Sequence, residues 1–332
     1  MPRQSSRPPS HLSRHPVALT ALAVLLALGP TACGSDDDAS PPSTTSGPPA
    51  TTLEPDTTAG TSVPPPRALL DDQTAPESIN GLVVDGDTLW IASIGDDVVL
   101  QVDRESGAIL ARIPGGGAGP DDVAVAPDGT VYSTGFTNGD VGRIADGEYS
   151  VLVTLVPGIN PITVGDDGTI WVGEMADGGD LTRIAPDGTT EVVATGLPTI
   201  NGFALDGEGR ILAPAGGMQA GEAGGTIVRI DPADGSVTTV ADGLPPVLAS
   251  TVDPEGRYLA LANVSGEVLL VDPEAGTFEV LHTVTEGAPF DNLDVAPDGT
   301  IYLSSFVAPT VTEVKPDGTV RVIPIGELPV QG

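Results

Sequence analysis

Oxygen-bearing side chains recur along this chain at intervals of roughly forty residues. Each position opens a short stretch in which apolar and polar residues alternate. Five of the six corresponding positions hold Asn or Asp and the fifth holds Leu: Asn80, Asp121, Asn160, Asn201, Leu248 and Asp291. Carboxylate and amide oxygens are the ligands that calcium prefers, and calcium takes about six to eight of them. If the fold gathers these six positions, which we call the ring positions, they predict a cation site. The alternative is that the Asn and Asp side chains only cap local backbone groups.

The elements that must position these residues follow from a repeat. The stretches "NGLVVDGDTLWIAS" from Asn80 and "NGFALDGEGRILAPA" from Asn201 each read strand, Asp-Gly or Glu-Gly turn, strand. A second hairpin follows each first one, as in "VVLQVDRESGAILARI" and "TIVRIDPADGSVTTVA". Period-two alternation indicates half-buried strands, and Asp-Gly supplies the positive φ of tight hairpins.

Six such units without a helical segment predict an all-β fold, a six-bladed β-propeller with four-stranded antiparallel blades. A β-solenoid is the competing repeat fold, but its strands are parallel and the hairpins argue against it. In a propeller the first strand of each blade lines the central channel. All six ring positions should therefore lie on one face, around the axis, where water is the alternative occupant to a metal ion.

The stretch "LTRIAPDGTTEVVATGLPTINGFALDGEGRILAP" resembles the regucalcin/gluconolactonase family of six-bladed propellers. The resemblance implies a divalent cation, most often calcium, on the channel axis. Members hold it with a Glu in the first blade, Asn residues in the middle blades and an Asp in the fifth. Catalytic members open lactone rings, and that Asp is proposed to move the proton or activate water.

Carried over residue by residue, the resemblance assigns Asn160 and Asn201 to the two Asn ligands. Glu77 stands for the first-blade Glu and Asn80 lies three residues later, although the family's Glu-Gly-Pro is absent. The fifth blade has Leu248-Ala249-Ser250 where the family has Asp-Gly, so the expected carboxylate is missing there. We therefore predict metal ligands at Glu77, Asn80, Asn160 and Asn201, and catalytic carboxylates at Asp291 and Asp121.

Two functions fit these residues. The first is a binding propeller that takes a small molecule or a protein at the ring face, with a structural cation. The second is a divalent-metal-dependent hydrolase acting on a lactone or a small ester. The only His after residue 15 is His282, on an expected outer strand, which argues against a Ser-His-Asp triad. The Gly-rich "GGGAGP" at 115–120 is expected to be a loop between blades.

The N-terminal residues read as an export signal. Arg3, Arg7 and Arg14 precede a short apolar run at 17–28, which is too short for a membrane span. Cys33, the only cysteine, lies in "GPTACGSDDD", which resembles the processing box of bacterial lipoproteins. The sequence thus predicts a signal peptide at 1–32, a lipid-attached Cys33 with a disordered tether at 33–66, and the propeller at 67–332.

The composition is strongly acidic, with 46 Asp and Glu against 13 Lys and Arg and a formal net charge of −33. Such a surface repels phosphate backbones, which argues against nucleic-acid binding. Together these features predict an exported monomer that is lipid-anchored to the outer face of a bacterial cell membrane.

Overall fold

The computed structural model describes residues 71–216 and 224–327 of the chain. They belong to one compact unit, Pro64–Gly332. The predicted signal peptide, Cys33, the tether and residues 67–70 lie outside the described residues. Within the described ranges, no helix is long and apolar enough to cross a bilayer.

The predicted fold is confirmed: six antiparallel four-stranded sheets follow one another along the chain. The first three are β1–β4 (Leu82–Asp85, Thr88–Ser93, Val98–Asp103, Ile109–Pro114), β5–β8 (Pro120–Val125, Val131–Gly135, Asp140–Ala145, Glu148–Thr154) and β9–β12 (Ile159–Val164, Ile170–Glu174, Gly179–Ile184, Thr190–Leu197). The other three are β13–β16 (Ala204–Leu205, Ile211–Ala215, Gly225–Asp231, Ser236–Leu244), β17–β20 (Ala249–Val252, Tyr258–Ala262, Glu267–Asp272, Thr277–Thr283) and β21–β24 (Phe290–Val295, Ile301–Ser305, Thr310–Val314, Val320–Pro324).

The Asp-Gly pairs make the turns that the sequence predicts. Between β5 and β6, Asp128 Oδ1 accepts a hydrogen bond from the Thr130 N–H at 2.9 Å, and Gly129 takes a φ of 84°. Only glycine adopts this left-handed backbone without strain, so the turn requires it.

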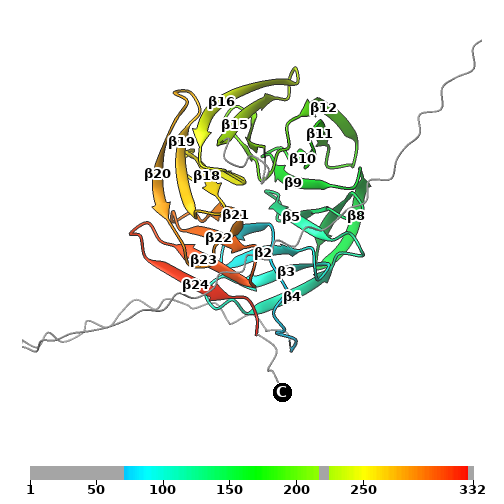
Figure 1. Cartoon of the computed structure of the whole chain (residues 1–332). Coiled ribbons are helices and arrows are strands. Elements are labelled where there is room, and N and C mark those ends of the chain that lie inside the picture. The colour runs from blue at the N-terminus through cyan, green and yellow to red at the C-terminus, as the bar shows by residue number, and fades with distance from the viewer. Residues whose placement is uncertain (1–70, 217–223, 328–332) are drawn as a thin grey trace, which may run out of the picture. The chain divides into compact units, whose positions relative to one another are not determined.

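The sheets are arranged radially, with the first strands near the axis and the fourth strands at the periphery (Figure 1). Apolar side chains fill the spaces between neighbouring blades. Trp90 belongs to the cluster between the first and second blades and Trp171 to that between the third and fourth, and both are buried. Both tryptophans therefore pack between neighbouring blades.

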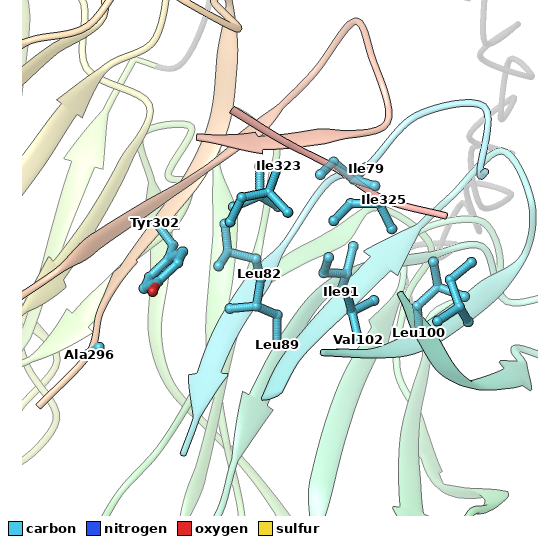
Figure 2. Close-up of a cluster of buried hydrophobic side chains, with 12 residues drawn as sticks. Ile79, Leu82, Leu89, Ile91, Leu100, Val102, Ala296, Tyr302, Ile323 and Ile325 are labelled. Atoms are coloured by element: carbon cyan, nitrogen blue, oxygen red, sulfur yellow. The ribbon is translucent and has the colours of Figure 1, made fainter. Parts of the chain in front are cut away.

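All four strands of the sixth blade, β21–β24, are consecutive in the chain, and no strand from before β1 joins this sheet among the described residues. The ring therefore closes by packing of β21–β24 against β1–β4. Figure 2 shows this junction, where side chains of the two blades interlock: Ile79, Leu82, Leu89, Ile91, Leu100, Val102, Ala296, Tyr302, Ile323 and Ile325. Backbone contacts add to it through a parallel bridge between Thr74 and Glu327. Gln73 also exchanges two hydrogen bonds with the Ile109 backbone, at 2.8 and 2.9 Å.

Candidate functional site at the channel mouth

The ring positions lie where the inner strands begin, as expected. Asp121, Asn160 and Asp291 are early residues of β5, β9 and β21, while Asn80 and Asn201 directly precede the segments that lead into β1 and β13. The loops that join second to third strands lie on the same face, which we call the ring face. Asn80 shows this directly, because its Oδ1 accepts the N–H of Ile94 from the β2–β3 loop at 3.3 Å.

Asp121 and Asn160 form the tightest pair of the site. Asn160 Nδ2 donates to Asp121 Oδ2 at 2.5 Å, across the boundary between the second and third blades, and both residues are buried. Asn160 Nδ2 also lies 3.5 Å from the Met175 sulfur, and Asn201 Nδ2 lies at the same distance from it. Met175 therefore bridges the third- and fourth-blade ring positions.

Asp291 joins the sixth blade to the first, because the Asn80 side chain lies close enough to its carboxyl group to lower the pKa of that group. Its negative charge also acts on Asp121, so the two carboxylates are close enough to repel each other. The structure thus brings together five of the six ring positions, and Asp121 and Asp291 are the two that bring negative charge.

The sequence did not reveal a second set of polar side chains deeper in the channel. Asn292 Nδ2 donates to Asp122 Oδ1 at 2.9 Å, which links the sixth blade to the second. Asp294 Oδ2 accepts the Val84 N–H at 2.8 Å, and Thr251 Oγ1 lies 3.3 Å from Asp294 Oδ1. These side chains line a cavity of about 130 Å³ that all six inner segments border.

Burial raises the pKa of all four channel aspartates, because a charged carboxylate loses its hydration there. The pKa rises to about 7 for Asp122 and to about 6 for Asp291 and for Asp294. The pKa of Asp121 is raised well above its ordinary value, first by burial and then by the charges of Asp291 and Asp122. Within the described part of the chain, no Lys or Arg charge offsets these shifts.

Glycine follows Asn in the first and fourth blades because the next blade approaches too closely for a side chain. A Cβ on Gly81 would lie 2.4 Å from Asp122 Oδ1 and 2.8 Å from the Asp121 carbonyl oxygen. A Cβ on Gly202 would lie 2.6 Å from that of Ala249, and the Gly202 carbonyl accepts the Ser250 N–H at 2.6 Å. The Asn-Gly pairs therefore set how closely neighbouring inner strands pack.

Two other ring-face residues differ from the Asp and Asn set. Leu248 is buried and its N–H donates to the Leu261 carbonyl. The fifth blade therefore offers no side-chain oxygen at its ring position. Glu77 is exposed, and its carboxylate lies 3.6 Å from where a Cβ on Gly95 would be. The ligand role predicted for Glu77 stays a prediction.

The Gly-rich segment 115–119 is a loop between β4 and β5, as predicted. The N–H groups of Gly117 and Gly119 donate to the Asp97 carboxylate at 2.6 and 2.9 Å, so a side chain of the protein fills this backbone concavity. The longest second-to-third-strand connection falls largely at 217–223, outside the described residues.

The donor set suits a hard cation. Among the described residues, no three His, Cys, Asp or Glu side chains gather closely enough to hold a metal ion. A cation at the mouth would therefore rest on Asp121 and Asp291, with amide oxygens from Asn80, Asn160 and Asn201 completing its shell. An amide that now donates can present its oxygen after a half-turn of its terminal bond.

Comparisons with known proteins agree with this architecture. A family model described as strictosidine synthase-like, N-terminal, matches residues 107–144, which run from the end of the β3–β4 turn into β7. None of the curated protein sequences compared with the chain matches it.

Solved structures resemble the chain over most of its length. Virginiamycin B lyase from Staphylococcus aureus is 17% identical, with a TM-score of 0.58 over 77% of this chain and 86% of that one. A gluconolactonase from Xanthomonas campestris is 18% identical, with a TM-score of 0.58 over 75% and 87%. Regucalcin from Agrobacterium tumefaciens, a calcium-binding protein, is 16% identical, with a TM-score of 0.53 over 70% and 83%. The likeness to the regucalcin and gluconolactonase propellers is thereby confirmed at the level of the fold.

Proposed function

We propose that this protein is an exported, lipid-anchored propeller that binds calcium, a divalent cation, at the channel mouth and a small-molecule ligand at the ring face. One observation supports the cation: buried Asp121 and half-buried Asp291 lie close together, and no Lys or Arg charge offsets theirs in the described residues. A bound divalent cation would supply that charge, and the three neighbouring Asn side chains add oxygen ligands.

Calcium titration of the propeller, from residue 67 onward, tests the cation. We expect one site per molecule, with affinity lowered about tenfold or more in Asp291→Asn, since that variant removes half of the ligand charge. Asp167→Asn is the matched control, because Asp167 is an exposed turn residue and Asn can keep its hydrogen bond to the Thr169 N–H. Many weak sites that respond equally to both variants would contradict a site at the mouth.

Hydrolysis of a lactone or a small ester is the second candidate function. Asp121 and Asp291 are the two carboxylates that the structure brings to the mouth, and a carboxylate can act as a general base towards water. When bound, the cation would polarise the carbonyl oxygen of the substrate. Asp291 or Asp121 would then take the proton from the attacking water.

Histidine-dependent chemistry has no support at this site. A catalytically inactive His-to-Ala form of the Staphylococcus aureus lyase has been crystallised with quinupristin. Here His282 lies on β20, a fourth strand at the periphery. A screen of lactones and esters in the presence of calcium decides between the two functions. Turnover that Asp291→Asn abolishes would establish the hydrolase, and a blank screen with intact calcium binding would favour the binding propeller.

A further inference from the structure

A cavity of about 680 Å³ lies between the fourth and fifth blades, and its size is typical of a small-molecule pocket. The turns β13–β14, β17–β18 and β19–β20 border it. These turns join first to second strands or third to fourth strands, so the cavity opens on the face opposite the ring face. We call it the blade cleft.

The fourth blade departs from the repeat where it lines the cleft. In each blade one residue of the second strand pairs with the residue three places after the ring position: Trp90 with Val83, Tyr132 with Ala124, Trp171 with Thr163, Leu212 with Ala204, Leu259 with Thr251 and Tyr302 with Asp294. Four blades thus place a Trp or Tyr against the next blade. The fourth blade instead places Leu212 there, and Leu212 lines the cleft.

The fifth blade lines the same cleft with aromatic side chains. Tyr258, on β18, is buried and stands where the other five blades have Leu, Val or Ile. Phe278, on β20, also lines the cleft and is 38% exposed. An apolar group in the cleft therefore has Leu212 on one side and two aromatic rings on the other.

Positive charge also gathers at the cleft. Two residues before Leu212 and Leu259 the chain has Arg210 and Arg257, whereas the other four blades have Thr at this position. Both arginines line the cleft, together with Arg229 on β15. These are three of the nine Lys and Arg residues in the described ranges, on a chain whose net charge is −33.

Two of these guanidinium groups share one half-buried carboxylate. Arg210 Nε donates to Asp206 Oδ2 at 2.7 Å, and Arg229 Nε lies 3.9 Å from the same oxygen. Arg229 Nε is buried and makes no hydrogen bond among the described residues. Arg257, by contrast, donates to Asp253 of its own turn at 2.7 Å. Asp206 alone therefore leaves one positive charge in excess beside Arg210 and Arg229.

Exposed glutamates now meet this excess charge. Glu274 reaches across from the fifth blade, where its Oε1 accepts from Arg229 Nη2 and lies 3.8 Å from Arg210 Nη2. Glu208 lies 3.0 Å from Arg210 Nη1. Their side chains are 74% and 72% exposed, and ion pairs this exposed stabilise a protein by only about 0–1 kcal/mol. Glu274 thus marks a carboxylate position from which it can be displaced at small cost.

We infer that the blade cleft binds an aryl carboxylate, a small molecule that carries a carboxylate one or two bonds from an aromatic ring. The carboxylate replaces that of Glu274 on Arg210 and Arg229, since guanidinium groups bind carboxylates through paired hydrogen bonds. The ring packs between Leu212 and the aromatic side chains of the fifth blade. This site goes beyond the proposed function and needs no cation, because it lies on the opposite face from the channel mouth.

Calorimetry with phenylacetate tests the inference. We expect one site per molecule and an affinity about tenfold lower for phenylacetamide, which keeps the ring and lacks the charge. Cyclohexylacetate, which keeps the charge and lacks the aromatic ring, should also bind more weakly. Glu274→Gln should raise phenylacetate affinity about twofold to fivefold, because it removes the competing carboxylate.

Leu212→Trp should abolish phenylacetate binding, since it fills the cleft with the kind of ring that four other blades carry at this position. Leu259→Trp is the matched control, because Leu259 is the equivalent residue of the fifth blade and faces the sixth blade instead. It should bind phenylacetate as the unaltered protein does. Thermal denaturation checks that both variants fold, and Glu274→Gln supplies the decisive comparison if Leu212→Trp does not.

Three results would overturn the inference: no phenylacetate binding at millimolar concentration, equal affinity for all three ligands, or phenylacetate binding that persists in a folded Leu212→Trp protein. An unchanged affinity in Glu274→Gln would also contradict it, since the ligand would then not replace Glu274. Calcium is left out of these titrations, so their outcome does not bear on the cation at the channel mouth.

Discussion

Gly81 controls how closely the first and second inner strands approach. Its N–H donates to the Asp121 carbonyl at 2.7 Å, and the space where a side chain would stand is taken by Asp122. Asp122 thereby reaches Asn292 in the sixth blade, although the first blade lies between them. One missing side chain thus allows a hydrogen bond between blades that are not neighbours.

We expect Gly81→Ala to lower the free energy of unfolding by about 2 kcal/mol or more, since the new methyl group meets backbone atoms that cannot move aside. Calcium affinity should fall with it, because Asp121 would be displaced. Gly207→Ala is the control, as a Cβ there has nothing within 4 Å. Chemical denaturation of both variants measures the difference, and equal stabilities would show that the inner strands can separate at no cost.

The aspartates of the channel, whose pKa values are raised, give the stability a distinctive dependence on pH. Because the pKa of Asp294 is raised from 3.8 to about 6, the folded state keeps a proton that the unfolded state releases. Its contribution to stability is therefore complete below about pH 3.8 and is lost as the pH rises through about 6. Turn residues such as Asp128 act oppositely: hydrogen bonds lower their pKa, so their contribution is lost as the pH falls.

Without calcium, we expect the melting temperature to be higher at pH 5 than at pH 8. Asp294→Asn should reduce this difference by raising stability at pH 8, since the amide carries no charge to bury. Asp317→Asn, at an exposed turn, should leave the difference unchanged. Thermal denaturation at the two pH values checks this, and an unaltered difference in Asp294→Asn would show that Asp294 does not ionise in this range.

At the scale of the elements, the junction between the sixth and first blades depends on a short segment before β1. The Gln73 side chain acts like a strand backbone, because it donates to the Ile109 carbonyl and accepts the Ile109 N–H. Ile109 is fully buried, so water cannot replace these bonds.

Gln73→Ala should therefore destabilise the propeller by about 1–3 kcal/mol. Thr74→Ala is the neighbouring control, since the Thr74 side chain is exposed and its bridge to Glu327 runs through the backbone. Urea denaturation measures both variants. A Gln73→Ala protein as stable as the control would mean that apolar packing alone closes the ring.

The strands, their turns and the ring positions follow from the sequence because alternation and Asp-Gly turns are local signals. The polar side chains deeper in the channel, such as Asp122 and Asn292, could not be predicted from these signals. If side chains alternated strictly and Asp121 and Asp291 faced the channel, their neighbours Asp122 and Asn292 would point away from it. In the structure Asp122 and Asn292 line the channel cavity as well. The register shifts between Pro120 and Val123 in β5 and between Phe290 and Leu293 in β21, and such bulges re-aim side chains.

Across the whole molecule, the acidic exterior and the lipoprotein-like N-terminus suit a propeller held at a cell surface. We propose that lipid on Cys33 holds it there. Cys33→Ala should move the protein from the membrane fraction to the soluble fraction, because the variant lacks the residue to which the lipid would be attached. Immunoblots of fractionated cells check this. Unchanged partitioning would show that another feature retains the protein.

The cation at the mouth is the central claim, and anomalous diffraction from crystals grown with calcium tests it most directly. We expect one strong anomalous peak on the axis, about 2.3–2.6 Å from carboxylate oxygens of Asp121 and Asp291 and within reach of the Asn80, Asn160 and Asn201 side chains. A channel mouth without such a peak, at a calcium concentration that saturates the calorimetric titration, would contradict the claim.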